Sequence, residues 1–165
     1  MGTRKGGLPI HQRVNRVVFG NTWKTRIFDE MTEAVDTYKE STWDSYFHAM
    51  SSHKRYIGTS IMLANEHVRS GFGVARYYIN RGDGRNAYRT LGWVLHTMQD
   101  STSRAHKYFQ KWHGATWKYR TEEWANHVRQ EMWSGQVRDS VYRASRWVWH
   151  MFYYRLVPSG NVFIF

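Results

Sequence analysis

The sequence contains no cysteine and only two prolines among its 165 residues. The lack of cysteine excludes disulfide bonds and thiolate metal sites, so any bound metal must rely on His, Asp, Glu, main-chain groups and water. Such nitrogen and oxygen ligands favour zinc, while manganese, iron and nickel stay open. No apolar run reaches the length of a membrane-spanning helix, and no apolar signal segment follows the basic start. We therefore expect a soluble chain without an export signal of its own.

Acidic residues are also scarce, because 13 Asp and Glu stand against 24 Lys and Arg and the net charge is +11. This excess of positive charge predicts an anionic partner: nucleic acid, a phospholipid surface or an acidic neutralising protein. Aromatic residues are abundant by contrast, at 17% of the chain. Most of them are expected to fill the core, and others to line a substrate groove or a lipid interface.

Helical periodicity of apolar residues runs through most of the chain, without an alternating strand pattern, an internal repeat or a domain linker. We expect a flexible lead over residues 1–7 and a single all-α, multi-helix domain over residues 8–165. Residues 41–55 are expected to form a connecting loop with a short turn, and residues 162–165 an extended tail. The expected helices cover residues 8–19, 27–38, 58–80, 85–99, 121–133 and 137–157.

The most informative stretch is LHTMQDSTSRAH at residues 95–106. His96 and Asp100 are four residues apart, so they project from the same face of a helix. His106 follows beyond a Ser/Thr run, and His127 with Glu131 repeats the four-residue spacing. One such pair is most often a surface hydrogen bond. Two pairs in one small domain, with His96 inside an apolar run, indicate a metal site, because buried polar groups need partners.

The pattern HxxxD followed by a His six residues later resembles the zinc-dependent phospholipase C and S1/P1 nuclease superfamily. These are helical enzymes that use three zinc ions to hydrolyse phosphodiesters. The resemblance extends to Pro9-Ile10-His11 and Tyr46-Phe47-His48 upstream, with Asp36 between them, and to HVRQE at residues 127–131. Within that group, the wording of residues 95–106 is most similar to C-terminal toxin domains of Rhs-type polymorphic toxins, and Gly7-Leu8 resembles the end of the junction that precedes those domains.

The resemblance implies two to three zinc ions and a metal-activated water that attacks phosphorus in line. Asp100 would bridge two ions and, with His96, form the catalytic core. The implied shells are His96, His48, Asp36 and Asp100 around one ion, His11 and Asp100 at another, and His106, His127 and Glu131 around the remaining one. His53 is the alternative to His48, which the aromatic context favours as the buried histidine.

Other residues attract weaker interpretations. Arg104 stands where members of the family usually have Pro. Arg104, Lys107 and Lys111 are candidate phosphate contacts, with a solvated basic loop as the alternative. His67 and His113 are expected to be structural or exposed, and His150 to lie on an aromatic core face. Arg81-Gly82-Asp83 is expected to be a helix-ending turn.

Together these features predict a zinc-dependent phosphodiesterase that works as a toxin or effector, secreted or delivered into a target cell by a Rhs-type shell and neutralised by a cognate immunity protein. A phospholipase C acting on anionic phospholipid membrane is favoured by the many Trp and Tyr. A nuclease acting on single-stranded nucleic acid is the direct alternative, since aromatic side chains also stack on bases. A non-enzymatic basic module that binds membrane or nucleic acid and a structural zinc domain are the remaining hypotheses.

Overall fold

A computed structural model describes residues 4–5, 8–38, 42–52, 54–102, 109, 111–112 and 139–163. This part of the chain is mostly helical, as the periodicity of the sequence predicts, and its strands are two residues long each. The elements in chain order are β1 (Arg4–Lys5), β2 (Leu8–Pro9), α1 (Ile10–Phe19), α2 (Trp23–Tyr38), the 3₁₀ helix η1 (Thr42–His48), β3 (Ser51–Ser52), α3 (Ile57–Asn80), α4 (Gly84–Ser101), β4 (Lys111–Trp112) and α7 (Asp139–Tyr153).

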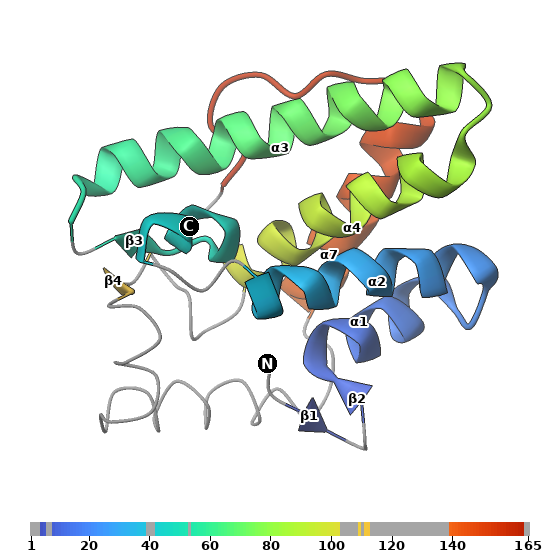
Figure 1. Cartoon of the computed structure of the whole chain (residues 1–165), viewed down its shortest axis with the longest axis horizontal. Coiled ribbons are helices and arrows are strands. Elements are labelled where there is room, and N and C mark those ends of the chain that lie inside the picture. Colours follow the sequence, from blue (N-terminus) through green and yellow to red (C-terminus); the bar gives the residue numbers. More distant parts are fainter. Residues whose placement is uncertain are drawn as a thin grey trace.

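Helix α4 is the central element of the described fold. Figure 1 shows it between α3 and α2, and it also packs against α7 and η1. Every residue from Val94 to Ser101 is buried. The apolar core surrounds the earlier part of the helix, where Leu91 and Leu95 meet Phe28 of α2 and Phe72 of α3. The carboxyl-terminal turns of α4 are therefore shielded from solvent although they carry His96 and Asp100.

Two glycines allow α4 to lie unusually close to its neighbours. A Cβ atom added to Gly92 would lie 2.4 Å from the carbonyl oxygen of Phe28, and one added to Gly71 would lie 2.3 Å from a methyl group of Val94. Any side chain at these positions would push the helices apart. The glycines thus set the spacing of α2 and α3 against α4.

The turn before α4 fixes where the helix begins. Gly82 has a positive φ of 75°, and the Asp83 carboxylate accepts a hydrogen bond from the Asn86 backbone N–H at 3.1 Å. This N-cap satisfies a backbone donor that the first turn would otherwise leave unpaired. The expectation that Arg81-Gly82-Asp83 is a helix-ending turn is confirmed, and Asp83 also caps the next helix.

Several element boundaries differ from the sequence-based expectation. Helix α2 begins at Trp23, because the Thr22 hydroxyl accepts from the Thr25 N–H and caps the helix there. Helix α1 begins at Ile10, since Leu8–Pro9 pairs with Arg4–Lys5 as an antiparallel ladder. The expected loop at residues 41–55 contains η1 and β3, and β3 pairs in parallel with β4.

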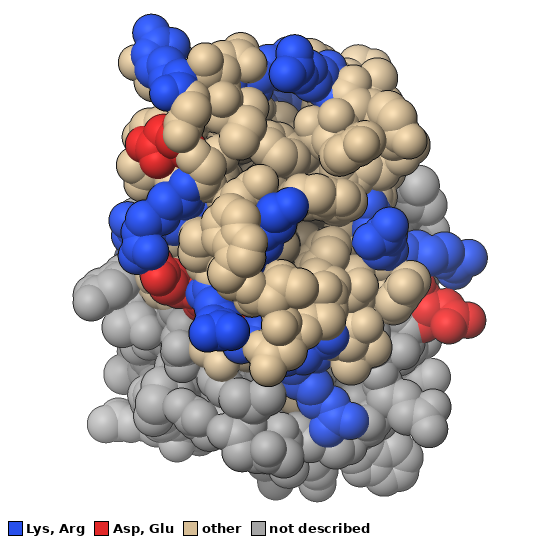
Figure 2. All heavy atoms as spheres, turned by 90° about the vertical axis from the view of Figure 1, so that its right-hand side faces the viewer, with Lys and Arg blue, Asp and Glu red and all other residues tan. Residues whose placement is uncertain are grey.

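Basic side chains outnumber acidic ones on the described surface seen in Figure 2. On the face shown in Figure 2, Lys and Arg side chains are spread among uncharged residues, and Asp and Glu are fewer, in keeping with the net charge of +11. Within the described residues, no helix combines the length and the apolar character that crossing a membrane would require.

Candidate metal centre

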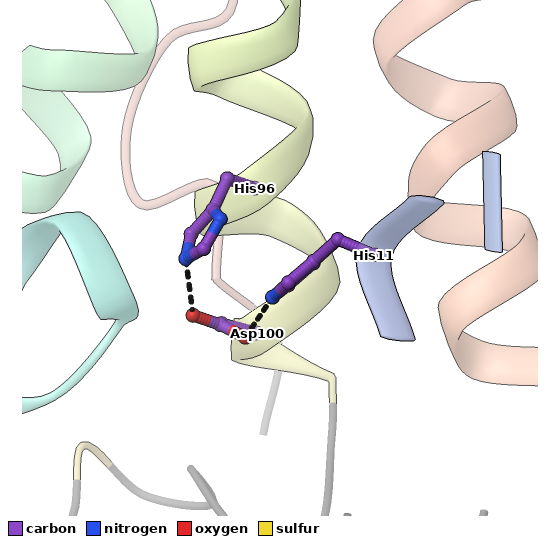
Figure 3. Close-up of side chains that lie close together, drawn as sticks. All are labelled: His11, His96 and Asp100. Atoms are coloured by element: carbon purple, nitrogen blue, oxygen red, sulfur yellow. Dashed lines mark ion pairs between the residues drawn. The ribbon is translucent and has the colours of Figure 1, made fainter. Parts of the chain in front are cut away.

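Three side chains from two helices converge at the carboxyl-terminal end of α4. His11 of α1 and His96 of α4 both point at the Asp100 carboxylate, as Figure 3 shows. The His11 Nε2 atom lies 3.0 Å from Asp100 Oδ1, and His96 Nε2 lies 3.0 Å from Asp100 Oδ2. One ligand atom from each residue falls within 4.8 Å of the others. The group therefore has the composition and the compactness of a metal-binding site.

His48, the last residue of η1, adds a third imidazole to this group. Its Nδ1 atom is 3.5 Å from Asp100 Oδ2 and 3.3 Å from His96 Nε2. The His48 ring meets the His96 ring edge to face, with 5.1 Å between the centroids, and His11 stacks on His96 at 4.0 Å. His48 is buried, as its aromatic context predicts. A helix at the start of the chain, a 3₁₀ helix and the central helix thus contribute to one cluster.

The ring of His96 is held from behind by the backbone of α2. Its Nδ1 atom lies 2.9 Å from the carbonyl oxygen of Thr32. A carbonyl oxygen only accepts, so this nitrogen carries the proton and donates. In the neutral ring, Nε2 then presents a lone pair toward Asp100 and His48. A donated hydrogen bond on the far nitrogen is the arrangement that metal-binding histidines usually have.

The arrangement has a direct electrostatic consequence. The Nε2 lone pair of His96 and the Asp100 carboxylate face one another where His96 is completely shielded from solvent. Such groups repel unless a cation or protons lie between them, because no bulk water is present to solvate them. Imidazole nitrogen and carboxylate oxygen are ligands that suit zinc. The donor set therefore fits the metal that the sequence predicts.

The remaining predicted ligands are not tested by the structure. Asp36 belongs to α2, but its side chain lies outside the described residues, and Lys111 is described only through its backbone in β4. The other predicted site residues that lie outside the described part of the chain are His53, Arg104, His106, Lys107, His113, His127 and Glu131. The cluster of His11, His48, His96 and Asp100 is thus the part of the predicted centre that the geometry addresses.

Two buried polar residues next to this cluster were not anticipated from the sequence. Gln99 Oε1 lies 2.9 Å from His11 Nδ1, and Gln99 Nε2 donates to Asn15 Oδ1 at 2.8 Å. Asn15 was detectable in principle, because it follows His11 by four residues on a helix face that also buries Val14 and Val18. Gln99 was detectable in the same way, because it follows Leu91 and Leu95 at intervals of four residues on the helix face that they bury.

The two other described histidines have different environments. His67 packs among aromatic rings, with Phe47 at 4.6 Å between centroids and Trp93 at 6.4 Å. Burial lowers the pKa of His67 from 6.5 to about 4, so its ring is neutral near pH 7. His150 is exposed, and its ring contacts that of Tyr154 in a tilted arrangement with 4.7 Å between the centroids. Its expected place on an aromatic core face is wrong, because α7 buries Val141, Ala144, Ser145 and Val148 instead.

Comparison with protein-family models, curated proteins and solved structures gives no match to this chain. The functional argument therefore rests on the residues of the cluster and on the spacing of the sequence motifs.

Proposed function

We propose that this chain is a zinc-dependent phosphodiester hydrolase with the fold type of the phospholipase C and S1/P1 nuclease group, acting as a toxin or effector domain. The observation that supports it most strongly is the convergence of His11, His48 and His96 on Asp100. The three histidines are distant in sequence, and a shared metal gives a physical reason for burying them around one carboxylate.

Asp100 has the geometry that a bridging ligand needs. Its Oδ1 atom faces His11, while its Oδ2 atom faces His96 and His48. Different histidine nitrogens therefore lie next to the two carboxylate oxygens. His48, His96 and Asp36 would complete one shell, and His106, His127 and Glu131 would hold a third ion. When bound, zinc lowers the pKa of a coordinated water toward neutrality and polarises phosphoryl oxygens, which is the chemistry that phosphodiester hydrolysis requires.

A pocket that is lined in part by Trp93, and by no member of the cluster, supports a phospholipid as the substrate. It has a volume of about 580 Å³, which is typical of small-molecule sites, and lies between α2, α3 and α4. Met31, Leu63, Val74 and Trp93 give it apolar walls. Trp93 is one helical turn before His96 on α4. A substrate with both a phosphodiester and an apolar portion, attracted by the net charge of +11, suits this combination.

Exposed aromatic side chains next to basic ones favour single-stranded nucleic acid as the alternative substrate. The Arg81 guanidinium lies 3.8 Å from the ring centroid of Tyr77, which is about half exposed, and the Lys24 ammonium lies 5.8 Å from that of Trp23. Such pairs stack on bases and bind phosphates. The same side chains would also serve a non-enzymatic binding module, which predicts binding without metal and without hydrolysis.

The deciding experiment measures zinc content by elemental analysis and then hydrolysis of anionic phospholipid vesicles, single-stranded DNA and RNA. Wild type is compared with His96→Ala and Asp100→Ala, and with His150→Ala as a matched control at an exposed histidine. We expect about two or three zinc ions per wild-type chain and a loss of hydrolysis of more than ~100-fold in both cluster variants. His150→Ala should behave as wild type. Less than one equivalent of zinc, or full activity in both cluster variants, would exclude the metalloenzyme.

The toxin role carries its own requirements. A hydrolase delivered by a Rhs-type shell needs a cognate immunity protein, and an acidic one would complement the basic surface. Expression inside a bacterial host should arrest growth for wild type and not for Asp100→Ala. Equal growth arrest by wild type and Asp100→Ala would show that the toxicity does not depend on the metal centre.

A further inference from the structure

A chain of side-chain hydrogen bonds leads from His11 of the cluster to an ion pair between Asp29 and Arg16. The His11 Nδ1 atom meets Gln99 Oε1 at 2.9 Å, and Gln99 Nε2 donates to Asn15 Oδ1 at 2.8 Å. Asn15 Nδ2 in turn donates to Asp29 Oδ1 at 3.0 Å, and Asp29 Oδ2 pairs with Arg16 Nη1 at 2.7 Å. Asn15, Gln99 and Asp29 are all buried.

The direction of this chain follows from the chemistry of its far end. The Asp29 carboxylate, paired with Arg16, accepts hydrogen bonds and cannot donate them. The Asn15 amide must therefore turn its NH₂ group toward Asp29 and its oxygen toward Gln99. Gln99 then has to present its own NH₂ group to Asn15, which leaves its oxygen facing His11.

A second contact imposes the same orientation on Gln99 independently. Gln99 Nε2 lies 3.1 Å from Ser145 Oγ, and the Ser145 hydroxyl donates to the carbonyl oxygen of Val141 at 2.9 Å. With its proton committed to Val141, the hydroxyl oxygen accepts from Gln99. Both amide protons of Gln99 are thus used by Asn15 and Ser145. The oxygen at His11 is an acceptor by both routes.

We propose that Gln99 is a positioning residue that holds His11 in one tautomer for metal binding, and that Asp29, through Asn15, sets the orientation of Gln99. The acceptor at Nδ1 keeps the proton on that nitrogen, so Nε2 presents its lone pair beside Asp100 Oδ1. The opposite tautomer would direct an N–H group into the cluster and remove His11 as a ligand. The role in metal binding rests on the proposed function, whereas the tautomer itself does not.

The first measurement determines the tautomer of His11 in the metal-free full-length chain. Long-range ¹H–¹⁵N NMR spectra, recorded at about pH 8 where an ordinary imidazole is neutral, distinguish a protonated Nδ1 from a protonated Nε2. We expect Nδ1 to carry a proton in wild type, whether or not Nε2 also holds one against Asp100, and to lose that proton at least in part in Gln99→Met, which keeps the length of the side chain and loses the amide. Ser145→Ala is the matched control, since Asn15 still orients Gln99 there, and it should retain the wild-type signal.

The second measurement is zinc affinity, determined by competition with a chelator of known affinity. Loss of a hydrogen-bond partner behind a metal ligand typically weakens binding by about 10–100-fold, and we expect a loss of this size in Gln99→Met and less than a few-fold in Ser145→Ala. Gln99→Met with the wild-type tautomer and affinity would overturn the proposal, as would an equal loss in Ser145→Ala.

A further variant decides the matter if Gln99→Met does not fold. Gln99→Glu keeps an acceptor oxygen for His11 but cannot donate to Asn15, so it should retain the protonated Nδ1 and bind zinc at least as tightly as wild type. A deprotonated Nδ1 or weaker zinc binding in a folded Gln99→Glu chain would contradict the proposed role. A wild-type chain that binds no zinc would instead remove the proposed function, while the tautomer measurement would still test how His11 is held.

Discussion

The two halves of α4 both contribute buried side chains, but they contact their neighbours through different kinds of side chain. The apolar half, Ala87–Leu95, packs by shape against Phe28, Phe72 and other core residues. The polar half, His96–Ser101, places a histidine, a glutamine and a carboxylate among partners that must match them atom by atom. Buried apolar side chains in this helix need neighbours that fill the space around them. Buried polar side chains need a donor or acceptor in a particular direction.

This difference determines how each half responds to substitution. An apolar contact can lose a methyl group and relax around the gap in part. A buried hydrogen-bonded group that loses its partner keeps its full desolvation cost, about 1–3 kcal/mol. The polar half therefore depends on every member of its network, as expected of a site that holds its side chains in one geometry.

His67 differs from the other residues beside the apolar half of α4, because it is a titratable group packed among aromatic rings. Burial lowers its pKa from 6.5 to about 4, so the unfolded chain takes up a proton first as the pH falls. Stability should consequently be lost between about pH 6.5 and pH 4, by at most about 3 kcal/mol. Urea unfolding of the metal-free chain at several pH values, compared with His67→Gln, measures this effect. An unchanged pH dependence in His67→Gln would show that His67 is not its source.

Gly92 tests the close approach in the apolar half. In Gly92→Ala the new Cβ would meet the carbonyl oxygen of Phe28 at 2.4 Å, and backbone cannot move aside as a side chain does. We expect a loss of about 1–3 kcal/mol in the free energy of unfolding. Gly73→Ala in α3 is the matched control, because it has open space around its Cβ position and should gain up to ~1 kcal/mol from helix propensity. Equal effects at the two glycines would refute the packing argument.

Arg85, in the exposed first turn of α4, belongs to neither kind of contact. Its guanidinium meets both oxygens of Glu30, at 3.0 and 3.1 Å, but both side chains are exposed. Arg85→Gln should lower the free energy of unfolding by only about 0.2–1 kcal/mol, and by less in high salt, because solvent screens the pair. Chemical denaturation at low and high salt checks this. A loss comparable with that of Gly92→Ala would mean that surface charge contributes as much as packing here.

Much of this fold could be predicted from local patterns. The periodicity of apolar residues over 58–80 and 85–99 predicts helices that the structure shows as α3 and α4, nearly at the same bounds. The contact between His96 and Asp100 is also local, because a spacing of four residues places both on one helix face wherever the helix lies.

The rest of the cluster depends on contacts between elements that are distant in sequence. His11 and His48 were suggested by resemblance to a family, and no periodicity of their own indicates that the start of α1 and the end of η1 lie beside α4. Helical spacing indicates the buried face on which Gln99 and Asn15 each lie, but their hydrogen bond joins residues 84 positions apart and depends on how α1 and α4 are placed. His150 was misplaced because aromatic neighbours alone do not reveal which face of α7 is buried.

By itself, the sequence determined the ligand chemistry, the positive charge and the helices, since composition and spacing follow directly from the order of residues. Only the tertiary structure decided which histidines meet, which of their nitrogens face the carboxylate and which amide holds His11. The physical reason is that helix formation is set by neighbours along the chain, whereas the direction of a buried hydrogen bond is set by whatever group the packing of helices brings to its other end.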